Sequence, residues 1–286
     1  MGLAMGLGFF LMTTFTGDSM TEAIASMNAP KLPGGREYNL AINSINQLIS
    51  FGLTAILARY LFMGQTLVTW RGPKSIGWIL WAVAFAYCAQ PLIDITYRLN
   101  ATCMKLLPKS WVASADLLEK MANDVTISLL SFDATWQFPA TLLAVAILPA
   151  ICEELTFRGV LQPLFSRWTG SFHVGIWISA LLFSAIHLQF HGFLPRMVLG
   201  AGLGYLVYYS GSLWPAILAH FLNNAMAICL AAWFGVDWIQ EEMVEMGPWE
   251  FGDYLTAAIS LPIVWFGFQW MQKRRVSILD HPTTGH

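Results

Sequence analysis

Three ionisable side chains stand close together in a part of the chain that is otherwise apolar. Glu153, Glu154 and Arg158 follow residues 138–152, which read FPATLLAVAILPAIC and carry no charge. A charge at the centre of a lipid bilayer costs between about 2.5 and 17 kcal/mol, depending on the method of measurement. Three such residues in a membrane helix therefore need a reason, which could be catalysis, ion pairing or proton transport.

The spacing of the three residues suggests that they have different tasks. Glu154 and Arg158 lie at positions i and i+4 of a helix, with the acid on the N-terminal side, which is the favourable order for an ion pair. Glu153 is rotated by about 100° around the helix and has no local partner. We therefore assign Arg158 to Glu154 and leave Glu153 for chemistry. In the alternative interpretation both acids pair with Arg158 and only hold helices together.

Later apolar segments contribute three more polar residues. His187 ends one segment, and His220 and Asn224 share one face of another because they are four residues apart. Each alone is typical of a hydrogen bond between helices. Together with Glu153 they could hydrolyse a peptide bond. A buried carboxylate can take a proton from water, a histidine can share that water, and a second histidine with an amide can stabilise an oxyanion.

The same side chains could instead hold a zinc ion, with Glu153, His187 and His220 as ligands. The chain lacks the H-E-x-x-H spacing, in which two histidines and the base share one helix. We therefore expect no cofactor, with zinc as the alternative. His191 is expected at the membrane interface, and we assign no role to the remaining histidines, which are His173, His281 and His286.

The composition is that of a polytopic membrane protein. Of 286 residues, 56% are hydrophobic and 11% are charged, whereas soluble domains carry about 25% charged residues. There is no basic patch to indicate a nucleic-acid partner, so the expected environment is the lipid bilayer. Hydropathy predicts an all-α fold of about eight membrane helices. They cover residues 2–15, 40–63, 76–95, 138–165, 174–188, 193–209, 213–234 and 254–271.

The predicted helices divide the chain into three regions. Residues 1–137 hold the first helices, a polar connector and an amphipathic interfacial helix near residues 111–125. Residues 138–234 hold all the candidate catalytic residues. Residues 235–286 form an acidic loop, the last helix and a basic tail. The basic Lys273-Arg274-Arg275 run places the C-terminus in the cytoplasm by the positive-inside rule.

Three motifs in this order are similar to those of a known family. They are EELTFRGVL at residues 153–161, FSAIH at 183–187 and HFLNN at 220–224, and a glycine-rich segment, residues 199–220, leads into the last one. Together they resemble the CPBP intramembrane proteases, also called the Abi family. This family includes the type II CAAX prenyl endopeptidases and bacterial bacteriocin-immunity proteins. The resemblance covers about residues 138–234.

The resemblance implies a hydrolase with a cavity open to the membrane, placed in a bacterial inner membrane. It implies that Glu153 and His187 activate water, that His220 and Asn224 form the oxyanion site, and that Glu154 and Arg158 support them. The expected substrate is a membrane-associated protein or a lipidated peptide, cleaved as in CAAX processing. Two other functions stay open, namely a non-catalytic scaffold or self-immunity protein and a proton-coupled transporter.

Overall fold

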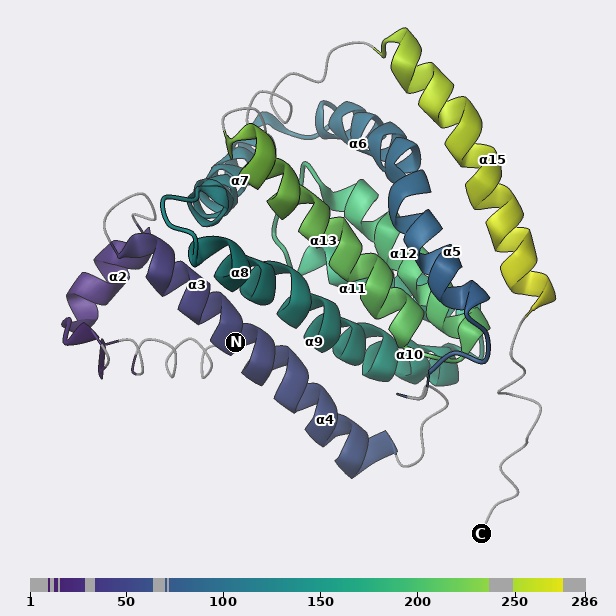
Figure 1. The fold of residues 1–286 in the computed structure, drawn as a ribbon, viewed down its shortest axis with the longest axis horizontal. Coiled ribbons are helices and arrows are strands. Elements are labelled where there is room, and N and C mark those ends of the chain that lie inside the picture. Colours follow the sequence, from purple (N-terminus) through teal and green to yellow (C-terminus); the bar gives the residue numbers. More distant parts are fainter. Residues whose placement is uncertain are drawn as a thin grey trace.

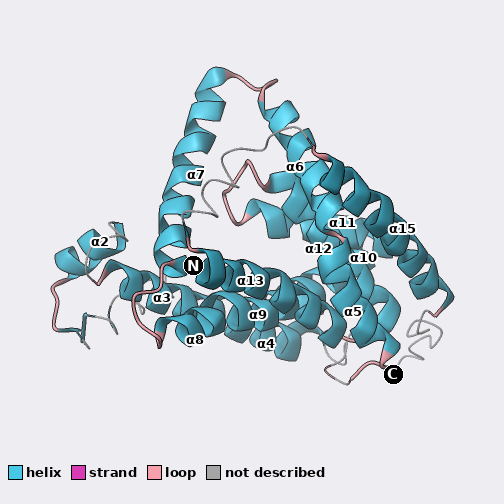
Figure 2. Ribbon diagram, turned by 45° about the horizontal axis from the view of Figure 1, so that its top comes forward, coloured by secondary structure: helices cyan, strands magenta, loops and turns pink. Residues whose placement is uncertain are grey.

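The computed structural model of the protein describes residues 10, 13–14, 16–28, 34–63, 70, 72–236 and 249–274 (Figure 1). In these residues the regular elements are helices, as predicted (Figure 2). The α-helices are α2 Met20–Asn28, α3 Gly35–Asn46, α4 Thr54–Ala58, α5 Gly77–Cys88, α6 Gln90–Met104, α7 Lys109–Leu130, α8 Gln137–Thr141, α9 Leu148–Thr156, α10 Gln162–Thr169, α11 Phe172–Ala185, α12 Phe193–Ser210, α13 Trp214–Phe234 and α15 Phe251–Lys273. Wider, π-type turns join some of them, at η1 Gln47–Leu53, η2 Arg59–Met63, η3 Leu142–Ile147 and η4 Phe157–Leu161.

One long helix forms the centre of the bundle. Helices α8, α9 and α10, with their connecting turns, make a continuous span of 33 residues, Gln137–Thr169, of which more than half is buried. The α3–α4 helix runs along one side of this span, and α13 packs against it as well (Figure 1). Ala146 and Ala150 are completely buried in the central helix. Small side chains of this kind let neighbouring membrane helices approach closely.

Helix α11 packs against α12 and against the C-terminal part of the central helix. Arg158 and Gln162 of the central helix donate to backbone carbonyls of α12. Gly200 of α12 is a point of close approach. A Cβ atom added there would lie 3.2 Å from the Phe183 ring and 3.4 Å from the Arg158 guanidinium. The lack of a side chain at Gly200 thus permits close packing here, and it brings the α12 backbone within reach of Arg158.

The prediction of one helix over residues 76–95 is wrong, because the helix is broken. The chain forms two helices there, α5 and α6, which meet at an angle of 43°. Pro91 lies in the first turn of α6. Proline lacks the N–H of a continuous helix and clashes with the preceding turn, so it commonly begins a new helix. Helix α15 packs along α5 and α6 at the edge of the bundle (Figure 1).

The prediction of eight membrane spans is not confirmed, although the membrane-helical class is. In the described residues four helices are long and apolar enough to cross a bilayer, or five if α5 and α6 count as one span. Helix α11 has only 14 residues, about 21 Å at 1.5 Å per residue, against a hydrocarbon core of about 30 Å. Helix α12 contains Arg196 and three tyrosines, which lower its hydropathy. Most of the expected first helix and acidic loop lies outside the described residues.

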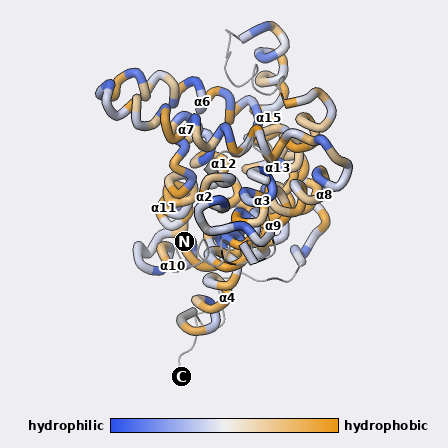
Figure 3. The backbone as a smooth tube through the Cα atoms, turned by 90° about the vertical axis from the view of Figure 1, so that its left-hand side faces the viewer, coloured by the Kyte–Doolittle hydropathy of each residue, from blue (hydrophilic) through white to orange (hydrophobic). Residues whose placement is uncertain are grey.

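Helix α7 corresponds to the predicted interfacial helix and is longer than expected, with 22 residues. Together with α6 it projects from the bundle (Figure 2), and its backbone carries more hydrophilic positions than the central helices (Figure 3). Trp111, Leu117 and Met121 are exposed on it. Large apolar side chains on the outside of a helix that also carries charges are typical of a helix at a membrane surface.

Candidate active site

A cavity of about 520 Å³ lies inside the bundle and collects the predicted catalytic residues. Glu153, His187, His220 and Asn224 all line it. They come from the central helix, the end of α11 and helix α13. The other walls are formed by α3 with η1, by α6 and α7, and by the first turns of α12. The structure therefore brings together four residues that the sequence separates by up to 71 positions.

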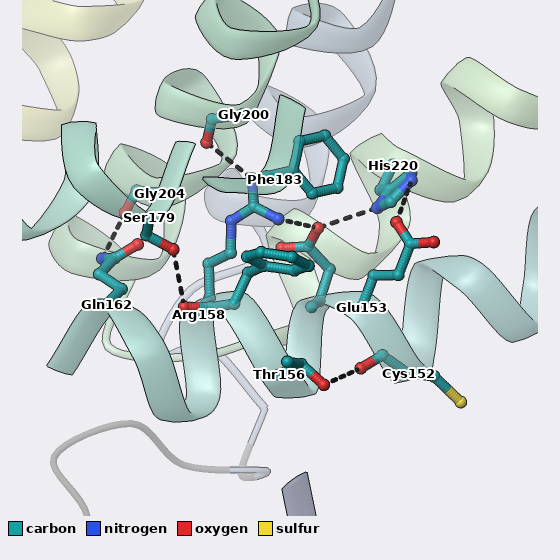
Figure 4. Close-up of polar contacts among 12 residues, drawn as sticks. Cys152, Glu153, Thr156, Arg158, Gln162, Ser179, Phe183, Gly200, Gly204 and His220 are labelled. Carbon is teal, nitrogen blue, oxygen red and sulfur yellow. Dashed lines mark hydrogen bonds and ion pairs between the residues drawn. The ribbon is translucent and has the colours of Figure 1, made fainter. Parts of the chain in front are cut away.

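Glu153 is held in a defined orientation at the edge of this cavity. Its side chain is only 5% exposed. Oε1 accepts a hydrogen bond of 2.7 Å from the Gln47 amide, which comes from η1 on the neighbouring helix. Oε2 faces His220, whose Nε2 is 4.0 Å away (Figure 4). One carboxylate oxygen is thus fixed by the protein, and the other is turned toward the histidine.

Glu154 belongs to a different, closed network. Arg158 donates to Glu154 Oε1 at 2.6 Å, and both side chains are almost completely buried. The predicted ion pair is therefore confirmed. Arg158 also donates to the Gly200 carbonyl at 2.7 Å and lies 4.8 Å from the centre of the Phe183 ring (Figure 4). The other oxygen of Glu154, Oε2, has no hydrogen-bond partner among the described residues.

His220 connects the closed network to the cavity. Its Nδ1 lies 2.9 Å from Glu154 Oε1, and its Nε2 faces Glu153. A carboxylate accepts hydrogen bonds, so Nδ1 carries a proton and donates it to Glu154. This contact was not anticipated from the sequence. It fixes the ring so that Nε2 is the nitrogen available to the cavity, in the way that a carboxylate commonly orients a functional histidine.

His187 lies directly after the end of α11, in a turn. Its Nδ1 is 2.7 Å from the carbonyl oxygen of Phe183, one helical turn earlier. A carbonyl can only accept, so Nδ1 is the protonated nitrogen and Nε2 keeps a free lone pair. Arg196 and Glu153 are both close enough for their charges to act on His187. The arrangement gives His187 the tautomer needed to accept a hydrogen bond from a water molecule.

Asn224 lies one turn after His220 on the same face of α13, as predicted. Its amide nitrogen donates to the Val145 carbonyl at 3.1 Å, and its oxygen accepts from Asn223 at 3.4 Å. An amide nitrogen carries two hydrogens, so one N–H of Asn224 remains available. Asn223 also lines the cavity and accepts a hydrogen bond from Gln90. The amide of Asn224 is thus positioned from two sides.

Gln47 and Arg196 are among the residues of the cavity wall that sequence reasoning missed. For Gln47 a signal was present, because Asn43, Ser44, Asn46 and Gln47 make the first half of a membrane span unusually polar. Polar residues in a membrane span favour a face that contacts other helices, and Asn43 donates to the Ala144 carbonyl at 2.8 Å. The specific partner of Gln47 could not be derived, since it lies 106 positions away.

The remaining described histidines lie outside the cavity wall. His191 pairs with Asp116 of α7 at 2.8 Å, and His173 is 3.1 Å from the Tyr205 hydroxyl. Within the described part of the chain, no three His, Cys, Asp or Glu side chains are grouped so that they could hold a metal ion. Glu153, His187 and His220 in their present positions therefore do not form a ready zinc site, and no step is derived through zinc.

Comparisons with known proteins agree with the motifs. Residues 135–226 match the family described as type II CAAX prenyl endopeptidase Rce1-like. The uncharacterized protein YpbD of Bacillus subtilis (strain 168) is 29% identical over 92 residues, which is 31% of this chain and 44% of YpbD. The chain thus spans less than half the length of that relative. No solved structure matches this chain significantly. The resemblance read from the motifs is confirmed for residues 135–226, which carry the four predicted catalytic residues and match the Rce1-like endopeptidase family.

Proposed function

We propose that this protein is an intramembrane endopeptidase that hydrolyses a peptide bond of a membrane-associated protein or lipidated peptide. The observation that carries the proposal is the wall of the cavity, where a buried carboxylate, two histidines and an amide meet. The match of residues 135–226 to a protease family supports the same reaction class. We further propose that the cleavage resembles that of CAAX proteases. The substrate can be prenylated or carry no prenyl group.

The proposed reaction begins with water bound between Glu153 and His187. Glu153 Oε2 takes a proton from the water, while the free lone pair of His187 Nε2 accepts a second hydrogen bond and orients it. The water oxygen then attacks the carbonyl carbon of the scissile bond. Gln47 keeps Oε1 of Glu153 occupied, so that the proton goes to the oxygen that faces the cavity.

The tetrahedral intermediate is stabilised by His220 and Asn224. His220 Nδ1 already donates to Glu154, so Nε2 can donate to the oxyanion only when the ring is a cation. In that form the ring donates from both nitrogens, to Glu154 and to the oxyanion. The remaining N–H of Asn224 is the second donor. The proton held by Glu153 passes to the leaving nitrogen, the C–N bond breaks, and a carboxylic acid and an amine leave the site.

The proposed orientation places the C-terminus in the cytoplasm of a bacterial cell, in the inner membrane. It is supported by Lys273 and Arg274 at the end of α15 and by the excess of basic residues in cytoplasmic segments of membrane proteins. Accessibility labelling of single cysteines placed after Lys273 would test this arrangement. Labelling from the outside of intact cells would contradict it.

Comparative terminal proteomics of membranes tests the proposed function. Membranes from cells with wild-type protein are compared with membranes containing Glu153→Ala, and new protein termini should be present only with the wild type. Glu37→Gln is the control, since Glu37 lies in the first turn of α3 and does not line the cavity. Identical termini in wild type and Glu153→Ala would refute the protease and favour a scaffold or immunity role.

A further inference from the structure

The cavity wall contains one cation that the proposed reaction does not use. Arg196 lies in the first turn of α12 and lines the cavity together with Glu153 and His187. Its side chain is partly buried. An arginine in the wall of an apolar bundle requires a physical explanation, because buried charges are normally paired or serve a function.

The hydrogen bonds of the Arg196 guanidinium go to neutral groups. Its guanidinium donates to the Gln189 side-chain oxygen at 2.9 Å and to the Gln189 carbonyl at 3.3 Å. The described residues supply it with no ion pair, in contrast to Arg158, which has Glu154 at 2.6 Å. The charges of Glu119 and Glu153 act on Arg196 only from a greater distance. A guanidinium has five N–H donors, so Gln189 leaves part of its donor capacity unused.

The position of Arg196 on its helix makes its charge still less favourable. The first turn of a helix is the positive end of the helix dipole, where acidic residues are favoured and basic ones are not. Next to the guanidinium stands Gly192, which also lines the cavity. A Cβ atom added at Gly192 would lie 3.1 Å from Nη2 of Arg196, so the absence of a side chain keeps this side of the guanidinium open.

From these observations we propose that Arg196 binds a carboxylate of the peptide substrate, an inference that rests on the proposed function. A guanidinium matches a carboxylate in geometry and can bind it through two parallel hydrogen bonds. The substrate class is then a membrane-associated peptide with an acidic side chain or a free C-terminus near the scissile bond. Arg196 determines specificity and orientation, while Glu153 remains the base.

The test measures binding of matched peptides to the full-length protein in detergent. The probes are palmitoylated decapeptide pools made in pairs, with Asp and Glu against Asn and Gln, and with a free C-terminus against a C-terminal amide. Binding to Glu153→Gln protein is read by mass spectrometry of the retained peptides, so the readout does not depend on cleavage. The carboxylate members should be retained about 10- to 100-fold better, as expected for hydrogen bonds to a charged group. Whichever pair shows the preference identifies the source of the carboxylate.

Four further variants, made on the same background, isolate the role of Arg196. Arg196→Met should abolish the preference, and Arg196→Lys should keep part of it because the charge remains. Arg167→Met removes an exposed arginine outside the cavity and should change nothing. Gln189→Ala removes the side-chain acceptor of Arg196 but keeps the Gln189 carbonyl, so it should weaken the preference less than Arg196→Met does.

Equal retention of carboxylate and amide peptides would overturn the proposal. A preference that survives Arg196→Met would do the same, and so would one that Gln189→Ala weakens more than Arg196→Met does, because the effect would then belong to the loop. The proposed protease can fail independently, through unchanged termini in Glu153→Ala cells. If cleavage is found, Arg196→Met should raise the KM for the carboxylate peptide about 10- to 100-fold with kcat unchanged.

Discussion

The two adjacent carboxylates of the central helix lie in contrasting surroundings. Glu154 is enclosed by Arg158 and His220, at 2.6 and 2.9 Å, and does not itself line the cavity. Glu153, one residue earlier, accepts a hydrogen bond from the neutral Gln47 amide and lines the cavity. A rotation of about 100° around one helix therefore separates a carboxylate that stabilises from a carboxylate available for chemistry.

His220 shows how the two regions depend on each other. Its Nδ1 belongs to the closed network and its Nε2 to the cavity. Arg158 in turn holds Glu154 and the Gly200 carbonyl, so three helices meet at one buried cluster. The closed network thus fixes the position of a proposed catalytic group without contacting the substrate. Substitutions in the network should mainly lower stability, and substitutions in the cavity wall should mainly lower the cleavage rate.

The largest effect on folding is expected from Arg158→Met, which breaks the closed network. Removing one partner of a buried ion pair leaves an uncompensated charge and lowers the free energy of unfolding by about 3–5 kcal/mol. Thermal unfolding in detergent measures the loss, and combining the change with Glu154→Gln should recover much of it. The control is Arg98→Met, since Arg98 and Asp94 form an i,i+4 pair that is one-third exposed and worth about 0–1 kcal/mol. Equal losses of stability in Arg158→Met and Arg98→Met would contradict the distinction between the buried network and an exposed ion pair.

On the cavity side, Asn224→Ala should lower kcat by about 10²- to 10³-fold, as is usual when one oxyanion donor is removed. Stability should change much less, because the lost bonds, to the Val145 carbonyl and from the Asn223 amide, join neutral groups. The assay is cleavage of the substrate identified by terminal proteomics. A changed KM with an unchanged kcat would remove Asn224 from the oxyanion site.

A smaller effect is expected from Gln47→Leu, which frees Oε1 of Glu153. The lost bond to a charged acceptor should slow cleavage about tenfold, and Gln47→Glu should be worse because it adds a like charge. Ser44→Ala serves as the control, since the Ser44 hydroxyl donates to the Leu40 carbonyl of its own helix. Wild-type rates in Gln47→Leu would show that Glu153 needs no such support.

No effect is expected from chelation. Purified protein treated with EDTA should cleave at the same rate as untreated protein, because the proposed steps use only side chains and water. The measurement is the cleavage rate before chelation, after it, and after addition of zinc. Activity that is lost and then restored by zinc would support the alternative in which Glu153, His187 and His220 bind the metal.

The sequence predicts local relations in this protein better than distant ones. The Glu154–Arg158 pair follows from a spacing of four residues on one helix, and so does the shared face of His220 and Asn224. That these residues meet His187 was inferred from the resemblance of three motifs, because spacing alone does not show which helices touch. Gln47 and Arg196 could not be assigned, since their neighbours in the cavity lie on helices distant in the sequence. Eight spans were expected because hydropathy does not distinguish a full span from the short α11 or from the bend between α5 and α6.

The most direct test compares Glu153→Gln with Glu154→Gln in purified protein, with cleavage and thermal unfolding measured on the same samples. Glu153→Gln should lose about 10²- to 10⁴-fold in rate, the usual contribution of a general base, and unfold like the wild type. Glu154→Gln should lose stability and activity together, because Arg158 and His220 both lose their partner. A Glu153→Gln protein that cleaves at the wild-type rate would contradict the account.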